Sequence, residues 1–315
     1  MNKLIVSSSP HIKAKTDTPR IMLDVIIALI PALIAGAIIY GLNSLAVVAT
    51  CVISSVAAEF FFNLIVKKKQ TILDLSAVIT GLILGLSLHA ATPLWMCVVG
   101  SVFAIIVVKC LFGGLGANFA NPAATARVLM IICFTKENFE KIPAGGVDPS
   151  APDLITGATP LAQIGTEEKL PSLLEMFLGD RGGAIGEACI AALVLGFVYL
   201  VIRGVINFEV PVIMVGTVFV LYLATGSSVN ESLYQILAGG LIFAAVFMAT
   251  DYVTTPMTRA GKMIFAFGAG LLTFLIREYG SYPEGASFAI LFMNILSPYI
   301  ESWTKPRALG KRGKK

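Results

Sequence analysis

Charged residues are scarce in this sequence. Asp, Glu, Lys and Arg make up 13% of its 315 residues, whereas hydrophobic residues make up 57%. A soluble protein of this length could not bury so many apolar runs of bilayer-spanning length. The composition therefore predicts a polytopic membrane protein in a lipid bilayer. Basic tails and loops account for the net charge of +4, so the charge indicates no nucleic-acid partner.

Histidine and paired cysteine motifs are also scarce. The two histidines, His11 and His89, lie in the N-terminal tail and at a predicted helix end, so we expect no bis-histidine haem. The five cysteines form no CxxC motif and lie in or beside apolar runs, as is typical of small buried hydrophobic residues. We expect no haem attachment, zinc site or complete iron–sulfur ligand set within this chain. A metal ligand shared with a partner subunit stays open.

Apolar runs predict an all-α protein with about ten transmembrane segments, five on each side of one long polar stretch. The expected organisation is a first membrane half at 1–134, an extracytoplasmic loop at 135–184, a second membrane half at 185–303 and a basic cytoplasmic tail at 304–315. The predicted segments are 21–40, 44–66, 72–88, 94–112, 119–134, 185–202, 210–226, 233–250, 262–277 and 285–303.

The distribution of Lys and Arg predicts the orientation. Most of the 23 basic residues lie on one side when the N-terminus is placed in the cytoplasm, as the positive-inside rule requires. The polar start of the chain is not a cleavable signal peptide, because the apolar run after it is too long. We expect both termini in the cytoplasm and the 135–184 loop outside the membrane of a bacterial cell.

Two pairs of short, similar segments within the sequence indicate an inverted repeat. Residues 20–25 resemble 203–210, and residues 119–127 resemble 253–259. Each half holds an odd number of segments, so the halves would insert with opposite topology. The proline in each member of the second pair predicts a broken or re-entrant segment. Two loops that match by chance are the alternative.

Ionisable residues within predicted spans are candidates for an ion pathway. Glu59 lies about two helical turns from Lys67 and could pair, bind a cation or stay protonated. Asp24 lies four residues from Arg20, a spacing that favours an ion pair on one helix. Asp251 lies close enough to a helix end to reach water, as do Asp74 and Glu187. The ion-pathway candidates are Glu59, Asp24 and Asp251.

A second polar group surrounds Pro122. Arg127 lies close in sequence to Asn118 and Asn121. A helix broken there would leave free backbone dipoles, which together with the arginine could hold an anionic or polar ring ligand. Arg127 could equally pair with a carboxylate and lock the fold.

The long polar stretch contains Asp153-Leu-Ile-Thr156-Gly157-Ala158-Thr159-Pro160. Thr followed by Pro is a common helix start, with Thr159 as the N-cap. The same string is similar to a bacterial flavinylation signature, in which an Asp lies six residues before the acceptor of Ser/Thr-Gly-Ala-Thr. A phosphate ester at a helix N-terminus would face free N–H groups. The two interpretations are therefore compatible.

The sequence resembles the NqrB/RnfD family over essentially its whole length. The short N-terminal tail is more similar to the D subunit of the Rnf ion-translocating oxidoreductase complex than to the B subunit of the sodium-pumping NADH:quinone oxidoreductase. The residues that carry the resemblance are the Asp24 helix, Gly116 to Arg127, Asp153 to Ala162 and Asp251 to Pro256.

This resemblance implies an electron-transfer subunit with FMN bound covalently to Thr159, and a noncovalent riboflavin. Asp153, Thr156, Gly157 and Ala158 would complete the attachment motif. Asn118, Asn121 and Arg127 are candidate contacts of the noncovalent flavin.

The resemblance further implies partners: the other subunits of a Na⁺- or H⁺-translocating ferredoxin:NAD⁺ oxidoreductase complex, and a flavin transferase for maturation. The chain has neither a ferredoxin-type cysteine run nor an NADH fingerprint, so no complete active site is expected in this chain alone. The competing hypothesis is a secondary transporter, because inverted repeats and broken helices are transporter features. A purely structural membrane subunit is a third possibility and predicts no flavin.

Overall fold

The computed structural model describes residues 17–134, 172–179, 183–280 and 285–306. Within these ranges every regular element is helical. The flavinylation motif at 153–159 lies outside the described residues. The elements before the long gap are α1 (Thr18–Tyr40), α2 (Leu42–Ile65), η1 (Ile72–Asp74), α3 (Ser76–Leu86), α4 (Leu94–Val102), η2 (Phe103–Cys110) and α5 (Pro122–Cys133).

The elements after the gap begin with the short helix α7. They are α7 (Leu173–Leu178), η3 (Ile185–Glu187), α8 (Ile190–Ile202), α9 (Glu209–Ala224), α10 (Val229–Leu237), α11 (Leu241–Phe243), η4 (Ala244–Met248), α12 (Arg259–Tyr279) and α13 (Ala286–Thr304). Their order follows the predicted order of apolar segments. The prediction of an all-helical polytopic membrane protein is confirmed.

Several predicted spans are shorter than expected. Among the described residues, three helices, α1, α2 and α12, are long and apolar enough to cross a membrane, and the bent pair of α10 with α11–η4 could supply a fourth span. The segment predicted at 72–88 contains an α-helix only from Ser76 to Leu86, because Leu75 has a positive φ of 62° and separates it from η1. Likewise α8 begins at Ile190 after the separate turn η3.

The two predicted proline breaks were wrong in position. Pro122 opens α5 at its first turn, where a missing N–H costs little, and Asn121 caps the helix. Pro256 lies in the loop before α12, whose N-cap Thr258 accepts a hydrogen bond from Gly261 N at 3.0 Å. The strongest bend, 62°, instead separates α10 from α11.

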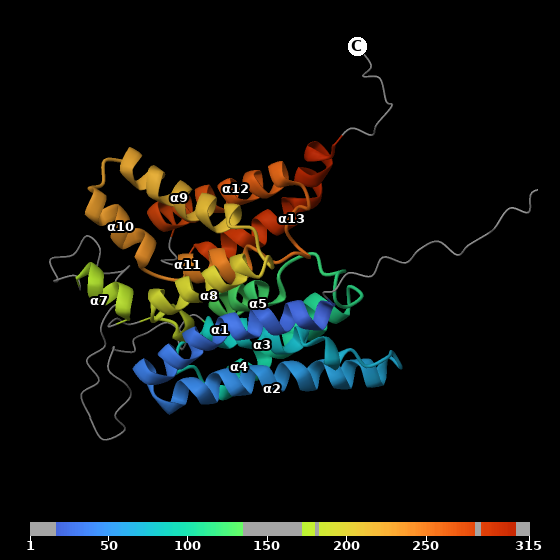
Figure 1. The fold of residues 1–315 in the computed structure, drawn as a ribbon. Helices are drawn as coiled ribbons and strands as arrows, with labels where there is room; N and C mark the ends of the chain where they lie inside the picture. Colours follow the sequence, from blue (N-terminus) through green and yellow to red (C-terminus); the bar gives the residue numbers. More distant parts are fainter. Residues whose placement is uncertain (1–16, 135–171, 180–182, 281–284, 307–315) are drawn as a thin grey trace, which may run out of the picture.

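The helices form two groups that meet in the middle of the molecule. In Figure 1, α1 to α4 lie along one side and α9 to α13 along the other, with α5 and α8 between them. Helix α2 packs against α3 and α4, while α12 packs against α9 and α13. The helices α1 and α8 pack against each other, so they join the two groups.

Glycine allows the closest helix approaches. A Cβ atom on Gly81 of α3 would lie 2.7 Å from Val52 Cα and 2.8 Å from Cys51 O on α2. Gly196 of α8 faces the backbone carbonyl of Ala28 on α1 in the same way. Gly81 and Gly196 therefore permit the close helix packing that small residues allow in a membrane.

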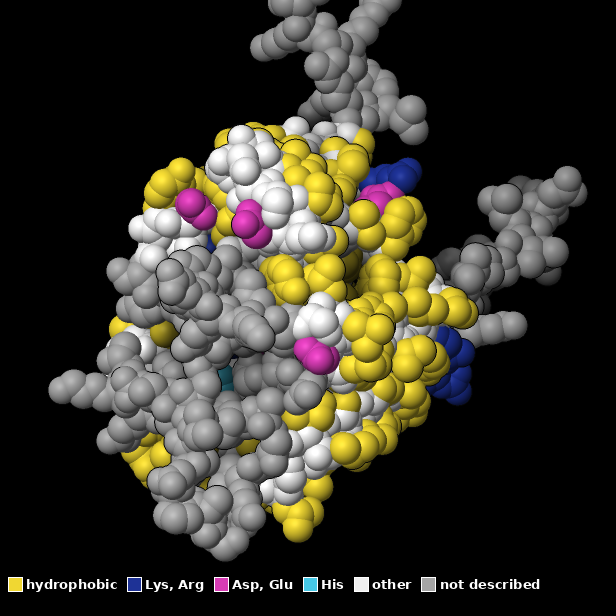
Figure 2. Space-filling view, turned by 90° about the vertical axis from the view of Figure 1, so that its left-hand side faces the viewer, with side chains coloured by type: hydrophobic (Ala, Val, Ile, Leu, Met, Phe, Trp, Pro, Cys, Tyr) yellow, Lys and Arg dark blue, Asp and Glu magenta, His cyan; other side chains and the backbone are white. Residues whose placement is uncertain are grey.

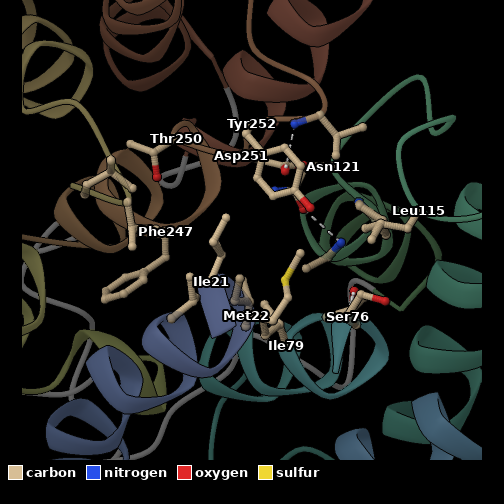
Figure 3. A pocket seen from close by; sticks show the side chains of 18 of the residues that line it. Ile21, Met22, Ser76, Ile79, Leu115, Asn121, Phe247, Thr250, Asp251 and Tyr252 are labelled. Carbon is tan, nitrogen blue, oxygen red and sulfur yellow. Dashed lines mark hydrogen bonds between the residues drawn. The ribbon is translucent and has the colours of Figure 1, made fainter. Parts of the chain in front are cut away.

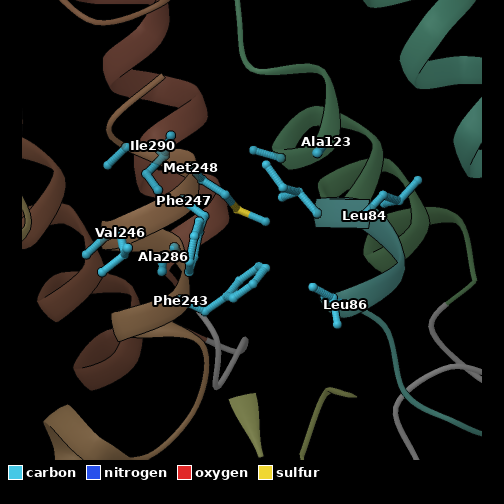
Figure 4. Close-up of a cluster of buried hydrophobic side chains, with 14 of the residues drawn as sticks. Leu84, Leu86, Ala123, Phe243, Val246, Phe247, Met248, Ala286 and Ile290 are labelled. Atoms are coloured by element: carbon cyan, nitrogen blue, oxygen red, sulfur yellow. The ribbon is translucent and has the colours of Figure 1, made fainter. Parts of the chain in front are cut away.

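The core between the two groups is aliphatic and aromatic. Figure 4 shows Leu84 and Leu86 from the first group facing Phe243 and Met248 from the second. Phe243 and Met248 are fully buried, as are both leucines. Packing of this kind holds membrane helices together by close van der Waals contact, because lipid offers no hydrophobic driving force between them.

The outer surface is also hydrophobic. Figure 2 shows many apolar and few charged side chains on one face. Ile38, Leu42 and Ile202 are each more than three-quarters exposed. An exposed apolar surface of this extent requires lipid or partner subunits around it. The protein is therefore a multi-pass membrane protein.

Candidate functional site

A cavity of about 100 Å³ lies between the two helix groups. Its walls come from α1, α3, η2, the loop before α5, the N-terminus of α5, α8 and η4 with the loop after it. Figure 3 shows Ile21, Met22 and Ile79 on one side and Asp251 and Tyr252 on the other. The cavity thus joins residues from opposite ends of the sequence, which is where membrane ligand sites of repeat-built proteins lie.

Both helix groups contribute a π-helical segment to the cavity wall. Lys109 lies on η2, and Val246 and Phe247 lie on η4. In a π-helix the backbone is wider than in an α-helix, and such segments are frequent at functional sites. Both segments end just before an irregular loop, so backbone polar groups and polar side chains gather at the same place.

Asn121 is fixed by hydrogen bonds at both ends of its side chain. Its Oδ1 atom accepts from the N–H groups of Ala123 at 3.0 Å and Ala124 at 3.2 Å, so it caps α5. Its Nδ2 atom donates to Met248 O at 3.2 Å, at the end of η4. Asn118, which also lines the cavity, donates to Ala120 O at 3.2 Å. Two of the three predicted flavin contacts therefore lie on the cavity wall.

Asp251 also lines the cavity, just beyond the end of η4. Its carboxylate accepts hydrogen bonds from Val253 N and Thr254 Oγ1, both at 3.2 Å. These bonds turn the chain out of the helix and hold the carboxylate at the wall (Figure 3). The structure therefore places one of the three ion-pathway candidates directly on the cavity.

Glu59 lies behind the cavity wall, paired with Lys109. The Nζ atom of Lys109 is 3.0 Å from each carboxylate oxygen of Glu59 and 2.6 Å from Ser76 Oγ. Both charged side chains are 2% exposed. The prediction that Glu59 could pair is confirmed, but its partner is Lys109 on η2 and not Lys67. Lys109 and Ser76 line the cavity themselves.

Asp24 joins the two helix groups. Its carboxylate accepts from Tyr199 Oη at 2.9 Å and from Arg203 Nε and Nη2, both at 3.2 Å. Both partners come from α8 or its C-cap, whereas Asp24 lies on α1. The sequence pointed to a neighbour on the same helix and did not predict these partners.

Arg127 does not line the cavity. Its Nη2 atom lies 3.2 Å from Glu187 Oε1, and each side chain of the pair is 2% exposed. Glu187 belongs to η3 and packs beside Gly240, at the break between α10 and α11. Of the two alternatives for Arg127, the pairing that locks the fold is the one observed. The expectation that Glu187 reaches water was wrong.

Metal ligands do not cluster in the described part of the chain. Within those residues, no group of three or more His, Cys, Asp or Glu side chains could hold a metal ion. All five cysteines are free; Cys51, Cys97 and Cys110 are buried, whereas Cys133 is exposed. The polar groups at the cavity are instead amides, hydroxyls, one ammonium and one carboxylate, which suit a polar organic ligand.

Comparison with known proteins decides the family. The model of the NQR2, RnfD, RnfE family matches residues 5–310. The chain belongs to this family. It is 45% identical, over 98% of its length and 95% of the relative's, to the D subunit of the Na⁺-translocating ferredoxin:NAD⁺ oxidoreductase complex of Acetobacterium woodii.

Other curated relatives agree with this assignment. The chain is 40% identical to the D subunit of the proton-translocating ferredoxin:NAD⁺ oxidoreductase complex of Clostridium ljungdahlii, over 99% of the chain and 97% of the relative. It is 35% identical to the D subunit of the ion-translocating oxidoreductase complex of Stutzerimonas stutzeri, over 95% of each. The predicted resemblance to the RnfD side of the family is confirmed.

The sequence predicted the positions of the buried charged residues better than it predicted their hydrogen-bond and ion-pair partners. Lys109 is buried against Glu59, a partner that was not predicted from the sequence. One signal was available, because a buried carboxylate at one helix end requires a cation, and Lys109 lies at the end of another apolar run. Nothing in the sequence indicated Ser76 as a partner of Lys109 or Tyr199 as a partner of Asp24, since hydroxyl-bearing residues are common in membrane helices.

Proposed function

We propose that the protein is a membrane electron-transfer subunit of an ion-translocating ferredoxin:NAD⁺ oxidoreductase complex. Family membership and the full-length similarity to the D subunits of such complexes support this proposal. The single observation that favours an electron-transfer role is the sequence from Asp153 to Thr159. A secondary transporter would have no use for a flavin attachment motif.

In this proposal FMN is esterified through its phosphate to Thr159. The flavin supplies the electron transfer, while the protein fixes its position and tunes its potential. Thr159 acts as a tether and moves no proton. Asp153, Thr156, Gly157 and Ala158 form the motif that a flavin transferase recognises, with small residues beside the acceptor hydroxyl.

The tether is tested by flavin fluorescence after denaturing electrophoresis of protein produced with a flavin transferase. We expect a fluorescent wild-type band and a dark Thr159→Val band, because only Thr159 occupies the acceptor position. Thr156→Val is the matched control and should lose only part of the signal. Full labelling of the Thr159→Val protein would refute the tether, and a dark wild-type band would remove the redox proposal.

We place the noncovalent flavin at the cavity between the helix groups. The amides of Asn118 and Asn121 offer polar contacts to a heteroaromatic ring, and Ile79, Ile83 and Phe247 offer apolar walls. Mostly apolar walls with a few fixed polar groups are typical of cofactor sites, but such sites usually have volumes of roughly 300–1,000 Å³. The cavity of about 100 Å³ would therefore have to widen to admit the flavin ring. Arg127 is bonded to Glu187 away from this wall, so the proposed contacts are the two asparagines.

The membrane arrangement belongs to the same proposal. Ten segments in two inverted halves would place both termini in the cytoplasm and the loop that bears Thr159 outside. Within the described ranges, five helical units precede the long gap: α1, α2, α3, α4 with η2, and α5. Five more follow in these ranges from α8 onward: α8, α9, α10 with α11 and η4, α12, and α13. These two sets support the count of ten. Other subunits of the complex would cover part of the apolar surface, and lipid the remainder.

Ion movement would follow the carboxylates Glu59, Asp24 and Asp251. Glu59 is the most informative, because it is buried and joined to the cavity through Lys109. We expect Glu59→Gln to lower the number of ions transported per electron while covalent flavin attachment stays at the wild-type level. Reconstituted vesicles report both quantities, by ion uptake and by in-gel fluorescence. Unchanged ion transport per electron would remove Glu59 from the pathway.

A further inference from the structure

A continuous hydrogen-bonded chain connects the exposed loop after α2 with the cavity. The Thr71 hydroxyl donates to Glu59 Oε1 at 2.6 Å, and Lys109 Nζ bonds both oxygens of Glu59. Lys109 also donates to Ser76 Oγ at 2.6 Å, and Ser76 donates to Asp74 Oδ1 at 2.5 Å. Four elements or their connections, α2, η1, η2 and α3, thus meet in one network.

The two ends of this network lie in different environments. Thr71 is exposed and Asp74 half-buried, whereas Glu59, Lys109 and Ser76 are buried. Lys109 and Ser76 line the cavity, but Glu59 and Thr71 do not. Two bonded paths therefore lead to the cavity. One runs from the exposed Thr71 through Glu59 to Lys109, and the other runs from the half-buried Asp74 to Ser76.

A salt bridge that only stabilised the fold would need no hydroxyl leading to solvent. Here Asn63 Nδ2 donates to Thr71 Oγ1 at 3.1 Å, which orients the Thr71 hydroxyl proton toward Glu59. All the groups of the path are polar groups that exchange protons, and each donor faces an acceptor at hydrogen-bond distance. Nearby charged and titratable groups are Lys68, Asp74 and Cys110, with Tyr252 close to Asp74.

We propose that Thr71, Glu59 and Lys109 form a proton relay from the cytoplasmic surface to the cavity ligand. This inference rests on the proposed noncovalent flavin in the cavity, which would accept the proton when it is reduced. The electrons that reduce this ligand would come from ferredoxin, a reactant in the names of the related complexes. The relay itself is neither oxidised nor reduced.

The proton transfers balance within the network. One N–H bond of Lys109 breaks as its proton passes to the cavity ligand, leaving a neutral amine. The Thr71 hydroxyl gives its proton to Glu59 and takes one from surface water. Glu59 then passes its proton to the Lys109 amine. The net result is one proton moved from bulk water to the cavity, with the carboxylate–ammonium pair restored.

The test compares Thr71→Val with Thr71→Ser in the purified whole complex. Serine keeps the hydroxyl, whereas valine removes it and so takes one hydrogen-bond partner each from the buried side chains of Asn63 and Glu59. Acid extraction first measures the noncovalent flavin. The flavins are then reduced by a light pulse with a photochemical electron donor. Flavin absorbance follows electron arrival, and a pH-indicator dye follows proton uptake.

We expect Thr71→Val to slow proton uptake by about a hundredfold, the low end of the range that a positioned proton-transfer group contributes. Electron arrival and flavin content should match wild type, and Thr71→Ser should behave as wild type. A second variant, Glu59→Leu with Lys109→Met, removes both charges together and should show the same slow uptake.

Three results would overturn the relay in distinguishable ways. Wild-type proton uptake in Thr71→Val with flavin bound refutes the relay and leaves the proposed function intact. Equal slowing in Thr71→Ser shows that the loop geometry, and not the hydroxyl, is responsible. Absence of noncovalent flavin from the wild-type complex refutes the proposed cavity ligand and the relay together.

Discussion

Replacing Arg127 by methionine should lower the free energy of unfolding by about 3–5 kcal/mol, the usual cost of leaving one partner of a buried ion pair uncompensated. Arg127 and Glu187 are each 2% exposed, and their charged groups lie 3.2 Å apart. Solvent cannot replace the guanidinium at this depth. The pair also joins α5 of the first group to η3 at the start of the second, so its loss weakens the contact between the groups.

Unfolding in mixed micelles with increasing sodium dodecyl sulfate measures this effect. Arg259→Met is the matched control, because Arg259 pairs with Glu209 but is 77% exposed. Water reaches Glu209 once that arginine is removed, so the control should lose about 1 kcal/mol or less. The double variant Arg127→Met with Glu187→Leu should recover most of the loss, since it buries no unpaired charge. Equal losses for Arg127→Met and Arg259→Met would show that burial does not govern the effect.

Lys109→Met should destabilise the protein by a similar amount, about 3–5 kcal/mol. The ammonium group bonds both oxygens of Glu59 and the hydroxyl of Ser76. Methionine has nearly the same length but donates no hydrogen bond, so Glu59 would keep a buried charge with only Thr71 as a partner. The same detergent titration measures the change in unfolding free energy.

The control for Lys109 tests whether charge or shape matters. Glu59→Leu with Lys109→Met removes both charges and should unfold close to wild type, within about 1–2 kcal/mol. Lys67→Met, on the exposed loop after α2, should have almost no effect. A double variant as unstable as Lys109→Met would mean that shape, and not the unpaired Glu59 charge, sets the stability of this region.

The sequence predicted the helical segments well because the bilayer imposes a length and composition on each. The apolar runs that begin near residues 21, 44 and 262 became α1, α2 and α12. Composition could not show where runs are interrupted. The breaks at Leu75 and at 238–240 depend on backbone conformation and packing, since Leu75 adopts a positive φ with no proline beside it.

The candidate site was predicted in part for the same reason. Asp251 was singled out because ionisable groups in apolar segments are costly and therefore functional candidates. Asn118 and Asn121 were singled out because they lie beside Arg127 at a predicted helix break. Their convergence on one cavity could not be predicted, since 127 positions separate Asn121 from its partner Met248. Only the packing of η4 against the start of α5 brings them together.

The sequence by itself determined that this chain is a helical membrane protein and which residues are costly to bury, and it supplied the predicted flavin attachment motif. These properties depend on composition, on the length of apolar runs and on a short local string. The tertiary structure decided the partners: Glu59 with Lys109, Arg127 with Glu187 and Asp24 with Tyr199 and Arg203. A buried charge requires a counter-charge, but any of several residues could supply it, and only helix packing selects the one within hydrogen-bond distance.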